Sequence, residues 1–125
     1  MRVITGSARG RRLRELEGLE TRPTTGKVKE ALFSVIQFDI EGRRVLDLFA
    51  GTGQLGIEAL SRGAESAVFV ERRKDALQAV RENLGACGFS DRARVVNGDA
   101  MSYLKSGEKF DLIFLDPPYA SGLLE

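Results

Sequence analysis

The chain has 125 residues, a formal net charge of +1 and an apolar content of 42%, which suffices for one domain with a modest core. It contains no histidine, and its one cysteine is Cys87, so an intramolecular disulfide, Ser-His-Asp or Cys-His catalysis and zinc hydrolysis are excluded, and no metal site is predicted. No apolar stretch reaches the ~20 residues needed to span a membrane, and the first residues lack the apolar core of a signal peptide. We therefore expect a cytoplasmic protein.

The first 20 residues form a basic N-terminal arm. Arg2–Thr5 and Arg12–Leu16 flank a turn at Gly6–Gly10, which predicts a short extended pair. The arginines that precede the first acidic residue, Glu15, are Arg2, Arg9, Arg11, Arg12 and Arg14. Guanidinium groups match phosphate oxygens and gain affinity from counterion release, which favours an RNA contact. A basic chain end is also often only solvated, so both interpretations stay open.

Residues 21–38, TRPTTGKVKEALFSVIQF, have the apolar spacing of an amphipathic helix. Thr24 or Thr25 can cap its start, and Pro23 disfavours helix in the residue before it. The apolar stripe expected to face the core consists of Val28, Ala31, Leu32, Val35 and Ile36.

The chain is organised around Arg44–Gly56, which reads RVLDLFAGTGQLG. A nearly unbroken apolar run, typical of a strand buried in a parallel sheet, leads directly into Gly51, Gly53 and Gly56. Glycines at this point permit positive φ and a close approach of the backbone to a ligand. A helix that opens at Gln54 would turn its free N–H groups to the same place, as nucleotide sites do.

Two cofactors compete for this loop. The three glycines fit G-x-G-x-x-G, and Glu71 lies twenty residues beyond Gly51, where a dinucleotide fold places its ribose-binding carboxylate. This spacing favours NAD as the cofactor and an NAD-dependent oxidoreductase as the function. Asp47 instead gives the pattern D-x-F-x-G-x-G, which looks like the adenosylmethionine loop of class I methyltransferases, and the loop alone leaves both open. A glycine turn before a packed helix is the third interpretation.

Strands and helices alternate through the rest of the chain. We expect strands at residues 66–70, 94–96 and 110–115, with helices at 75–84 and 100–105 between them. The pattern predicts a parallel α/β sheet with ligands at the carboxyl ends of its strands. The residues at such ends are Asp47, Gly51, Gly53, Glu71, Asp99 and Asp116. Glu71 is suited to ribose hydroxyls and Asp99 to an adenine amino group.

Asp116–Tyr119, Asp-Pro-Pro-Tyr, is the most specific motif in the chain. Two prolines remove two backbone donors and end the strand, so the carbonyls of Asp116 and Pro117 remain open to an outside donor. These acceptors can position the exocyclic amine of a nucleobase, and Tyr119 offers a ring on which the base can stack. The alternative is a proline-terminated strand with a packed tyrosine.

With these motifs in order, the chain resembles the RsmD family of bacterial small-subunit ribosomal RNA guanine-N2 methyltransferases. The resemblance covers essentially the whole chain and rests on RVITGSARGRRL, TRPTTGKVKEALFSVI, VLDLFAGTGQLGIEALSRGA, VFVE, NGDA and FDLIFLDPPY. It implies a Rossmann-like class I methyltransferase fold that transfers a methyl group from S-adenosylmethionine to N2 of a guanine in 16S ribosomal RNA, alone or in an assembling subunit.

The resemblance also assigns residues to roles. Asp47, Gly51 and Gly53 would hold the methionine part of the cofactor, Glu71 the ribose, and Asp99 with Ala100 the adenine. The residues expected at the target base are Asp116, Pro117 and Tyr119. Arg22 and Thr24 would line the cleft near the methyl donor. The arginines expected to contact RNA are Arg9, Arg11, Arg12 and Arg22.

Two departures from the family pattern stand out. Gly26 occupies a position where an acidic residue is usual, which weakens the cap of the first helix. The chain also supplies four strands of a sheet that has seven in class I methyltransferases, in the order 3-2-1-4-5-7-6. We therefore expect residues 1–125 to form a single, partial domain whose fourth strand is an exposed edge, able to pair with a second copy. A non-catalytic RNA-binding module is the remaining alternative.

Overall fold

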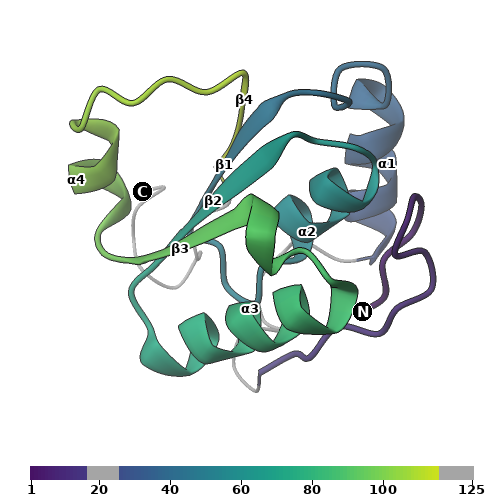
Figure 1. Ribbon diagram of the computed structural model, residues 1–125, viewed down its shortest axis with the longest axis horizontal. Coiled ribbons are helices and arrows are strands. Elements are labelled where there is room, and N and C mark those ends of the chain that lie inside the picture. Colours follow the sequence, from purple (N-terminus) through teal and green to yellow (C-terminus); the bar gives the residue numbers. More distant parts are fainter. Residues whose placement is uncertain (17–25, 116–125) are drawn as a thin grey trace.

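The structure, a computed structural model, describes residues 1–16 and 26–115 (Figure 1). Its helices and strands alternate in the predicted order. They are α1 (Gly26–Ile36), β1 (Arg44–Leu48), α2 (Gln54–Ser61), β2 (Ser66–Glu71), α3 (Lys74–Cys87), the short 3-10 turn η1 (Ser90–Arg92), β3 (Ala93–Asn97), α4 (Ala100–Leu104) and β4 (Leu112–Leu115).

The described strands form one parallel sheet in the order β3-β2-β1-β4. Leu48 at the end of β1 lies between Val70 of β2 and Leu115 of β4, while Glu71 pairs with Asn97 of β3. The carboxyl ends of all four strands therefore meet at one edge of the sheet. This arrangement confirms the predicted α/β fold and brings the loops that follow these strands together.

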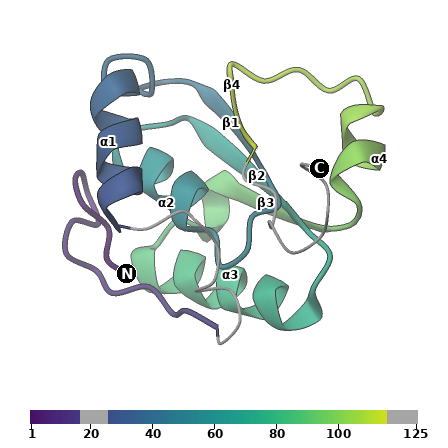
Figure 2. The same ribbon diagram turned by 180° about the vertical axis from the view of Figure 1, so that it is seen from behind.

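The two faces of the sheet are covered unequally. Alternate strand residues such as Val45 and Phe69 pack with α1, α2 and α3 in the larger hydrophobic core. The opposite residues, such as Leu46 and Val68, form a smaller core with Ala100 of α4. Figures 1 and 2 show α4 apart from the other three helices, on the far side of the sheet. Of the described helices, α4 alone packs on that face.

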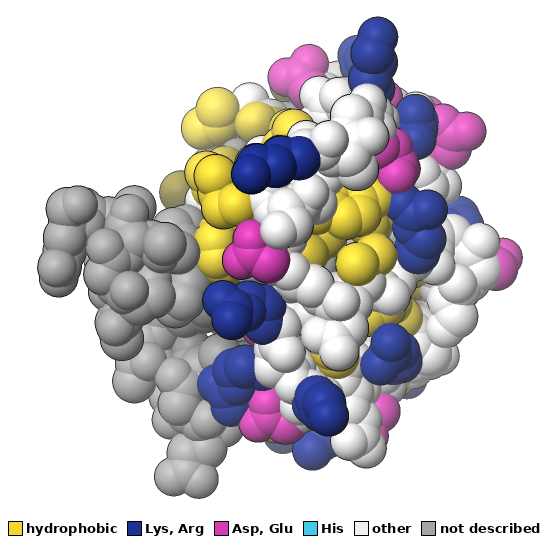
Figure 3. Space-filling model, turned by 90° about the vertical axis from the view of Figure 1, so that its left-hand side faces the viewer, with side chains coloured by type: hydrophobic (Ala, Val, Ile, Leu, Met, Phe, Trp, Pro, Cys, Tyr) yellow, Lys and Arg dark blue, Asp and Glu magenta, His cyan; other side chains and the backbone are white. Residues whose placement is uncertain are grey.

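The β4 edge carries exposed apolar side chains, as the sequence predicts. Ile113 is 47% exposed and Leu115 is 61% exposed, whereas Phe114 between them is buried against Phe33 of α1. Met101 and Leu104 of α4 are also exposed. Figure 3, which views the molecule from the α4 side of Figure 1, shows hydrophobic side chains gathered on this face.

The first helix differs from its prediction in the face that it buries. Val28, Ala31 and Val35 are exposed, while Lys29 and Phe33 are fully buried. The predicted stripe is therefore wrong for three of its five residues; Leu32 and Ile36 are partly buried, as the prediction requires. The physical reason is that Lys29 has an ionic partner in the core: its Nζ lies 3.1 Å from Oε1 of the equally buried Glu58 of α2.

The N-terminal arm (residues 1–16 in the structure) is packed onto α2 and α3. Arg2 and Arg12 form an isolated antiparallel bridge, which confirms the paired arrangement without an extended ladder. The side chains that anchor the arm in the core are those of Val3, Ala8 and Leu13. Within residues 1–16 and 26–115, no helix is both long and apolar enough to cross a membrane.

Candidate functional site

The loop between β1 and α2 has the backbone conformation that its glycines predict. Gly51 and Gly53 have φ values of 61° and 86°, in the left-handed region where a glycine pays no steric cost. Phe49 also has a positive φ, 55°, although it carries a side chain. Such strain in a non-glycine residue is typical of functional loops. Gly53 is the N-cap of α2, so the loop presents backbone N–H groups at the start of a helix.

Asp47 and Gly56 fix this helix against the sheet. Asp47, the penultimate residue of β1, is 1% exposed and accepts a hydrogen bond of 3.0 Å from the Gly56 N–H. A Cβ atom on Gly56 would lie 2.3 Å from Cε2 of Phe69. Glycine is therefore required for close packing of α2 on the sheet, and Asp47 orients the helix start from within the core.

Glu71, at the end of β2, holds the glycine loop from the other side. Its Oε1 accepts a hydrogen bond of 2.8 Å from the Gly51 N–H, and its Oε2 accepts from the N–H groups of Arg72 and Arg73, each at 3.0 Å. A carboxylate has about four acceptor positions, so one remains for a ligand hydroxyl. Glu71 lies at the predicted edge of the sheet and is 8% exposed.

Asp99 and Ala100 follow β3 at the same edge. Asp99 is the N-cap of α4, and its Oδ2 accepts a hydrogen bond of 3.0 Å from the Ser102 N–H. Its Oδ1 lies 3.8 Å from the guanidinium of Arg72. The Gly98 N–H donates to the carbonyl of Glu71, which ties this turn to the end of β2. Ala100 is buried beneath the turn.

One buried polar atom beside the loop has no partner within residues 1–16 and 26–115. Oε1 of Gln54, the first residue of α2, is inaccessible to solvent and has no hydrogen-bond partner among the residues that the structure describes. Unpaired buried acceptors are rare in folded proteins, so this oxygen is a candidate acceptor for a donor on a ligand. An ammonium group supplies such donors. The Gly51–Gly53 backbone, the Gln54 oxygen and the Glu71 carboxylate therefore fit a ligand that carries an amino acid and a ribose.

The arginines of the arm lie on its surface. The side chains of Arg9, Arg11 and Arg12 are exposed and form no ion pair with any other residue in the described part of the chain. Arg14 differs because its guanidinium pairs with Glu82 of α3. Free guanidinium groups on a packed, ordered turn are available to phosphate oxygens.

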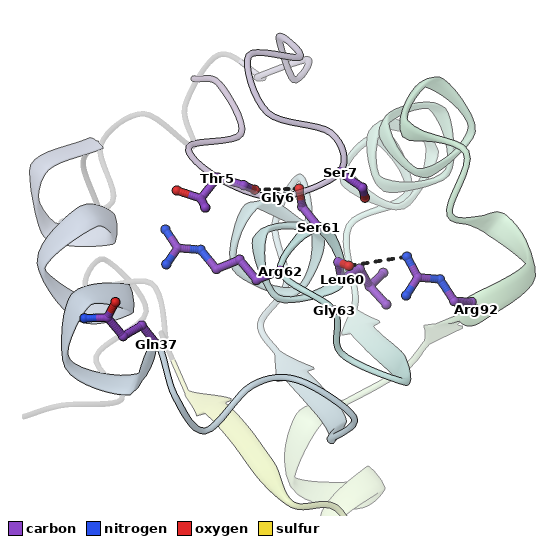
Figure 4. A pocket seen from close by; sticks show the side chains of 9 residues that line it. All are labelled: Thr5, Gly6, Ser7, Gln37, Leu60, Ser61, Arg62, Gly63 and Arg92. Atoms are coloured by element: carbon purple, nitrogen blue, oxygen red, sulfur yellow. Dashed lines mark hydrogen bonds between the residues drawn. The ribbon is translucent and has the colours of Figure 1, made fainter.

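A pocket of about 440 Å³ lies at the other end of α2, away from the glycine loop (Figure 4). The residues that line it are Thr5, Gly6, Ser7, Gln37, Leu60, Ser61, Arg62, Gly63 and Arg92. Its two guanidinium groups are engaged by the protein: Arg62 donates to Glu58, and Arg92 donates to the carbonyls of Ala64 and Leu60. We therefore assign both arginines to the stabilisation of the end of α2.

Several predicted residues lie outside the described part of the chain: Asp116, Pro117, Tyr119, Arg22 and Thr24. The structure brings together Gly51, Gly53, Glu71 and Asp99 at one edge of the sheet, with Asp47 and Ala100 beneath it. Asn83 of α3 was not among the predicted residues; it is 2% exposed and donates to the carbonyl of Thr52 in the loop at 2.9 Å. Its position next to Leu84, on the buried face of a predicted helix, could have identified Asn83 as a buried polar residue.

Comparison with known proteins gives a consistent result. A family model described as "Conserved hypothetical protein 95" matches residues 1–125. YlbH, a candidate rRNA methyltransferase of Bacillus subtilis strain 168, is 50% identical over 123 residues, which cover 95% of this chain and 67% of YlbH. The ribosomal RNA small subunit methyltransferase D of Escherichia coli K12 is 42% identical over 126 residues, which cover 100% of this chain and 63% of that protein.

The fold comparison agrees with the sequence comparison. The structure of yhhF, a candidate methyltransferase of Escherichia coli, matches with a TM-score of 0.86 at 39% identity, over 99% of this chain and 67% of that one. Structural neighbours of the chain are class I methyltransferases, which argues against the NAD-dependent oxidoreductase. The chain spans 63–67% of the length of these relatives. It belongs to the Conserved hypothetical protein 95 family, the RsmD family of class I methyltransferases.

Proposed function

We propose that this chain is the cofactor-binding part of an S-adenosylmethionine-dependent RNA methyltransferase that modifies the exocyclic N2 of a guanine in 16S ribosomal RNA. The observation that carries the proposal is the Gly51–Gly53 loop tied to Glu71 at the carboxyl edge of the sheet. Family membership and the relative named ribosomal RNA small subunit methyltransferase D support the substrate class.

Each residue at this edge has a proposed task in binding. The loop backbone at Gly51 and Gly53 would approach the methionine part, and Oε1 of Gln54 would accept from its ammonium group. Glu71 has one acceptor position left for a ribose hydroxyl, and Asp99 would accept from the adenine amine. When bound, the cofactor supplies a methyl group on a sulfonium, which is transferred to the target nitrogen.

The residues proposed to hold the target base are Asp116, Pro117 and Tyr119. The carboxylate and the proline carbonyl would accept both N–H groups of the guanine amine and leave its nitrogen lone pair directed at the methyl group. Tyr119 would stack on the base, a contact worth ~1–3 kcal/mol in comparable complexes. No histidine base is required, because the nitrogen can lose its proton as the methyl group arrives.

The arm extends the proposed substrate contact. Arg9, Arg11, Arg12 and Arg22 would bind RNA phosphates, which predicts an affinity that falls with salt. A ribosomal RNA substrate, free or in an assembling small subunit, places the reaction in the cytoplasm. We also propose that the exposed β4 edge pairs with a second copy of the chain.

Calorimetric titration with S-adenosylmethionine, with NAD in a parallel titration, tests the cofactor. We expect saturable binding of S-adenosylmethionine alone. Glu71→Ala should weaken it at least tenfold, because it removes a ligand acceptor and releases the Gly51 N–H. Asp116→Ala should bind the cofactor as the unchanged chain does, yet lose methyl transfer to 16S RNA. Transfer is followed with tritiated cofactor and mapped to the modified nucleotide.

A matched control is Asp91→Ala, which removes an exposed carboxylate from η1. This variant should keep both cofactor binding and methyl transfer. Binding of NAD in place of S-adenosylmethionine would contradict the proposal. RNA binding without cofactor binding would instead identify a non-catalytic RNA-binding module.

A further inference from the structure

Asn83 joins the N-terminal arm, which is proposed to bind RNA, to the glycine loop, which is proposed to bind the cofactor. Its side chain lies on α3, between Arg14 of the arm and Thr52 of the glycine loop, and is 2% exposed. Nδ2 donates to the carbonyl of Thr52 at 2.9 Å and to the carbonyl of Arg14 at 3.1 Å, while Oδ1 accepts from the Arg14 N–H at 2.7 Å. Figure 1 shows the N-terminal segment beside α3.

These three hydrogen bonds determine the orientation of the amide. Both N–H groups point at carbonyl oxygens and the oxygen points at an N–H group, so a flipped amide would oppose like groups at every contact. Because the site is buried, the loss of any one bond would leave a desolvated polar group. The arm and the loop are therefore held at a fixed separation through one rigid side chain.

The carboxyl group of Glu15 in the arm is influenced by the first residue of α2. Glu15 follows Arg14 in the arm, and Gln54 follows the glycine loop. The N-terminal ammonium group lowers the pKa of Glu15, and the Gln54 side chain contributes to the same shift through a hydrogen bond. Nε2 of Gln54 also lies 3.4 Å from the hydroxyl of Thr52. Asn83 thus ties the arm backbone to Thr52, and Gln54 lies beside the same loop residue.

We propose that Asn83 is a positioning residue that couples the arm to the cofactor loop, so that RNA on the arm and S-adenosylmethionine at the loop bind with positive cooperativity. The inference rests on the proposed function. RNA bound to the arm would restrain the arm backbone at Arg14, and Asn83 would pass this restraint to Thr52, so the loop would lose less conformational freedom when the cofactor binds. Linkage requires that the cofactor increases RNA affinity by the same factor.

Amide hydrogen exchange without any ligand tests the mechanical part. In Asn83→Ala we expect the amides of Arg14, Gly51 and Gly53 to exchange together, about tenfold faster than in the unchanged chain. The matched control is Glu82→Gln, at the residue of α3 that precedes Asn83. It removes the carboxylate that pairs with the Arg14 guanidinium but leaves the hydrogen bonds of Asn83 intact. Equal exchange rates in the two variants would overturn the proposal.

Asn83→Asp is the second variant, for use if the alanine variant does not fold. It keeps the side-chain volume and the acceptor for the Arg14 N–H, but it turns an oxygen toward the carbonyls of Thr52 and Arg14. Relative to the unchanged chain, we expect the exchange rates of the loop amides to increase more than the exchange rate of the Arg14 amide. Unchanged loop exchange would overturn the positioning role.

Calorimetry with a short RNA hairpin tests the coupling. In the unchanged chain and in Glu82→Gln, we expect saturating RNA to increase cofactor affinity about fivefold, within the usual range of coupling between sites. In Asn83→Ala the factor should fall to about one. A fivefold factor that persists in Asn83→Ala would overturn the coupling. Failure of the unchanged chain to bind the cofactor would contradict the proposed function, whereas the exchange experiment decides the positioning role independently.

Discussion

At the scale of single residues, the site depends on how closely α2 approaches the sheet. Gly56 lies at this contact, because a Cβ atom there would lie 2.3 Å and 2.7 Å from two ring carbons of the fully buried Phe69. The same atom would lie 3.2 Å from Oδ2 of Asp47, which accepts from the Gly56 N–H. The packing of α2 and the orientation of the loop therefore both require a residue without a side chain at position 56.

Gly56→Ala should destabilise the chain by about 2 kcal/mol, the usual cost of overpacking a filled core. Because the Phe69 ring is fully buried in the core, we expect the start of α2 to shift away from β2. We expect a lower denaturation midpoint and weaker S-adenosylmethionine binding, measured by urea unfolding and by calorimetry.

Gly85→Ala is the matched control. Gly85 lies inside α3, and a Cβ atom there would have no neighbour within 4 Å. Alanine should stabilise this position by about 0.5–1 kcal/mol, because it lowers the conformational entropy of the unfolded chain. Equal effects of the two substitutions would show that close packing at Gly56 has no special role.

At the scale of elements, α1 shows what apolar periodicity can miss. Its hydrophobic spacing predicts Val28 and Val35 in the core, yet the helix is rotated so that Lys29 and Phe33 are buried. The partners of Lys29 are Glu58 and the carbonyl of Arg2, which lie 29 and 27 positions away in the sequence. Analysis of apolar periodicity treats a charged residue as exposed. The residues near Lys29 in the sequence do not indicate that it has a buried ionic partner elsewhere in the chain.

Lys29→Met should destabilise the chain by about 3 kcal/mol, because removal of one partner leaves a buried carboxylate with fewer compensating charges. Glu58 would keep Arg62 and the N–H groups of Ile4 and Thr5, which places the expected cost at the low end of the usual range. Burial lowers the pKa of Lys29 and Glu58 opposes this shift. Equilibrium unfolding in urea at pH 7 measures the loss.

Lys27→Met, on the exposed side of the same helix, provides the comparison. It makes the same change from lysine to methionine. Because this side chain is exposed, the substitution should change the unfolding free energy by less than about 0.5 kcal/mol. A loss of similar size in both variants would place the cost in the helix itself rather than in the buried ion pair.

The parallel strands and the glycine loop were predictable because each depends on residues that are adjacent in the sequence. An apolar run, a glycine at positive φ and a carboxylate at a strand end are local features, and the sheet then brings Glu71 beside Gly51. The contacts of Asn83, Glu58 and Ser61 with the arm join residues more than 50 positions apart. Local periodicity carries no information on such pairs, so the packed arm could not be foreseen.

At the scale of the whole molecule, the two faces of the sheet differ in how they are covered. Of the described helices, three pack on one face, and α4 lies on the other, which also carries the exposed side chains of Ile113 and Leu115 of β4. An edge strand with unpaired backbone groups and apolar side chains is a template for another strand. This combination is the basis of our proposal that copies of the chain associate through β4.

Leu115→Lys should therefore shift the chain toward monomer, because a charge on an edge strand opposes pairing with a second copy. Sedimentation equilibrium over a hundredfold range of concentration measures the mass. The control is Phe38→Lys, since Phe38 follows α1 and is 89% exposed, more than the 61% of Leu115. Both variants remove an exposed apolar side chain and add a charge, but only one lies on the edge strand. A monomer mass for the unchanged chain at every concentration, or dissociation caused equally by Phe38→Lys, would show that β4 is not the surface through which copies associate.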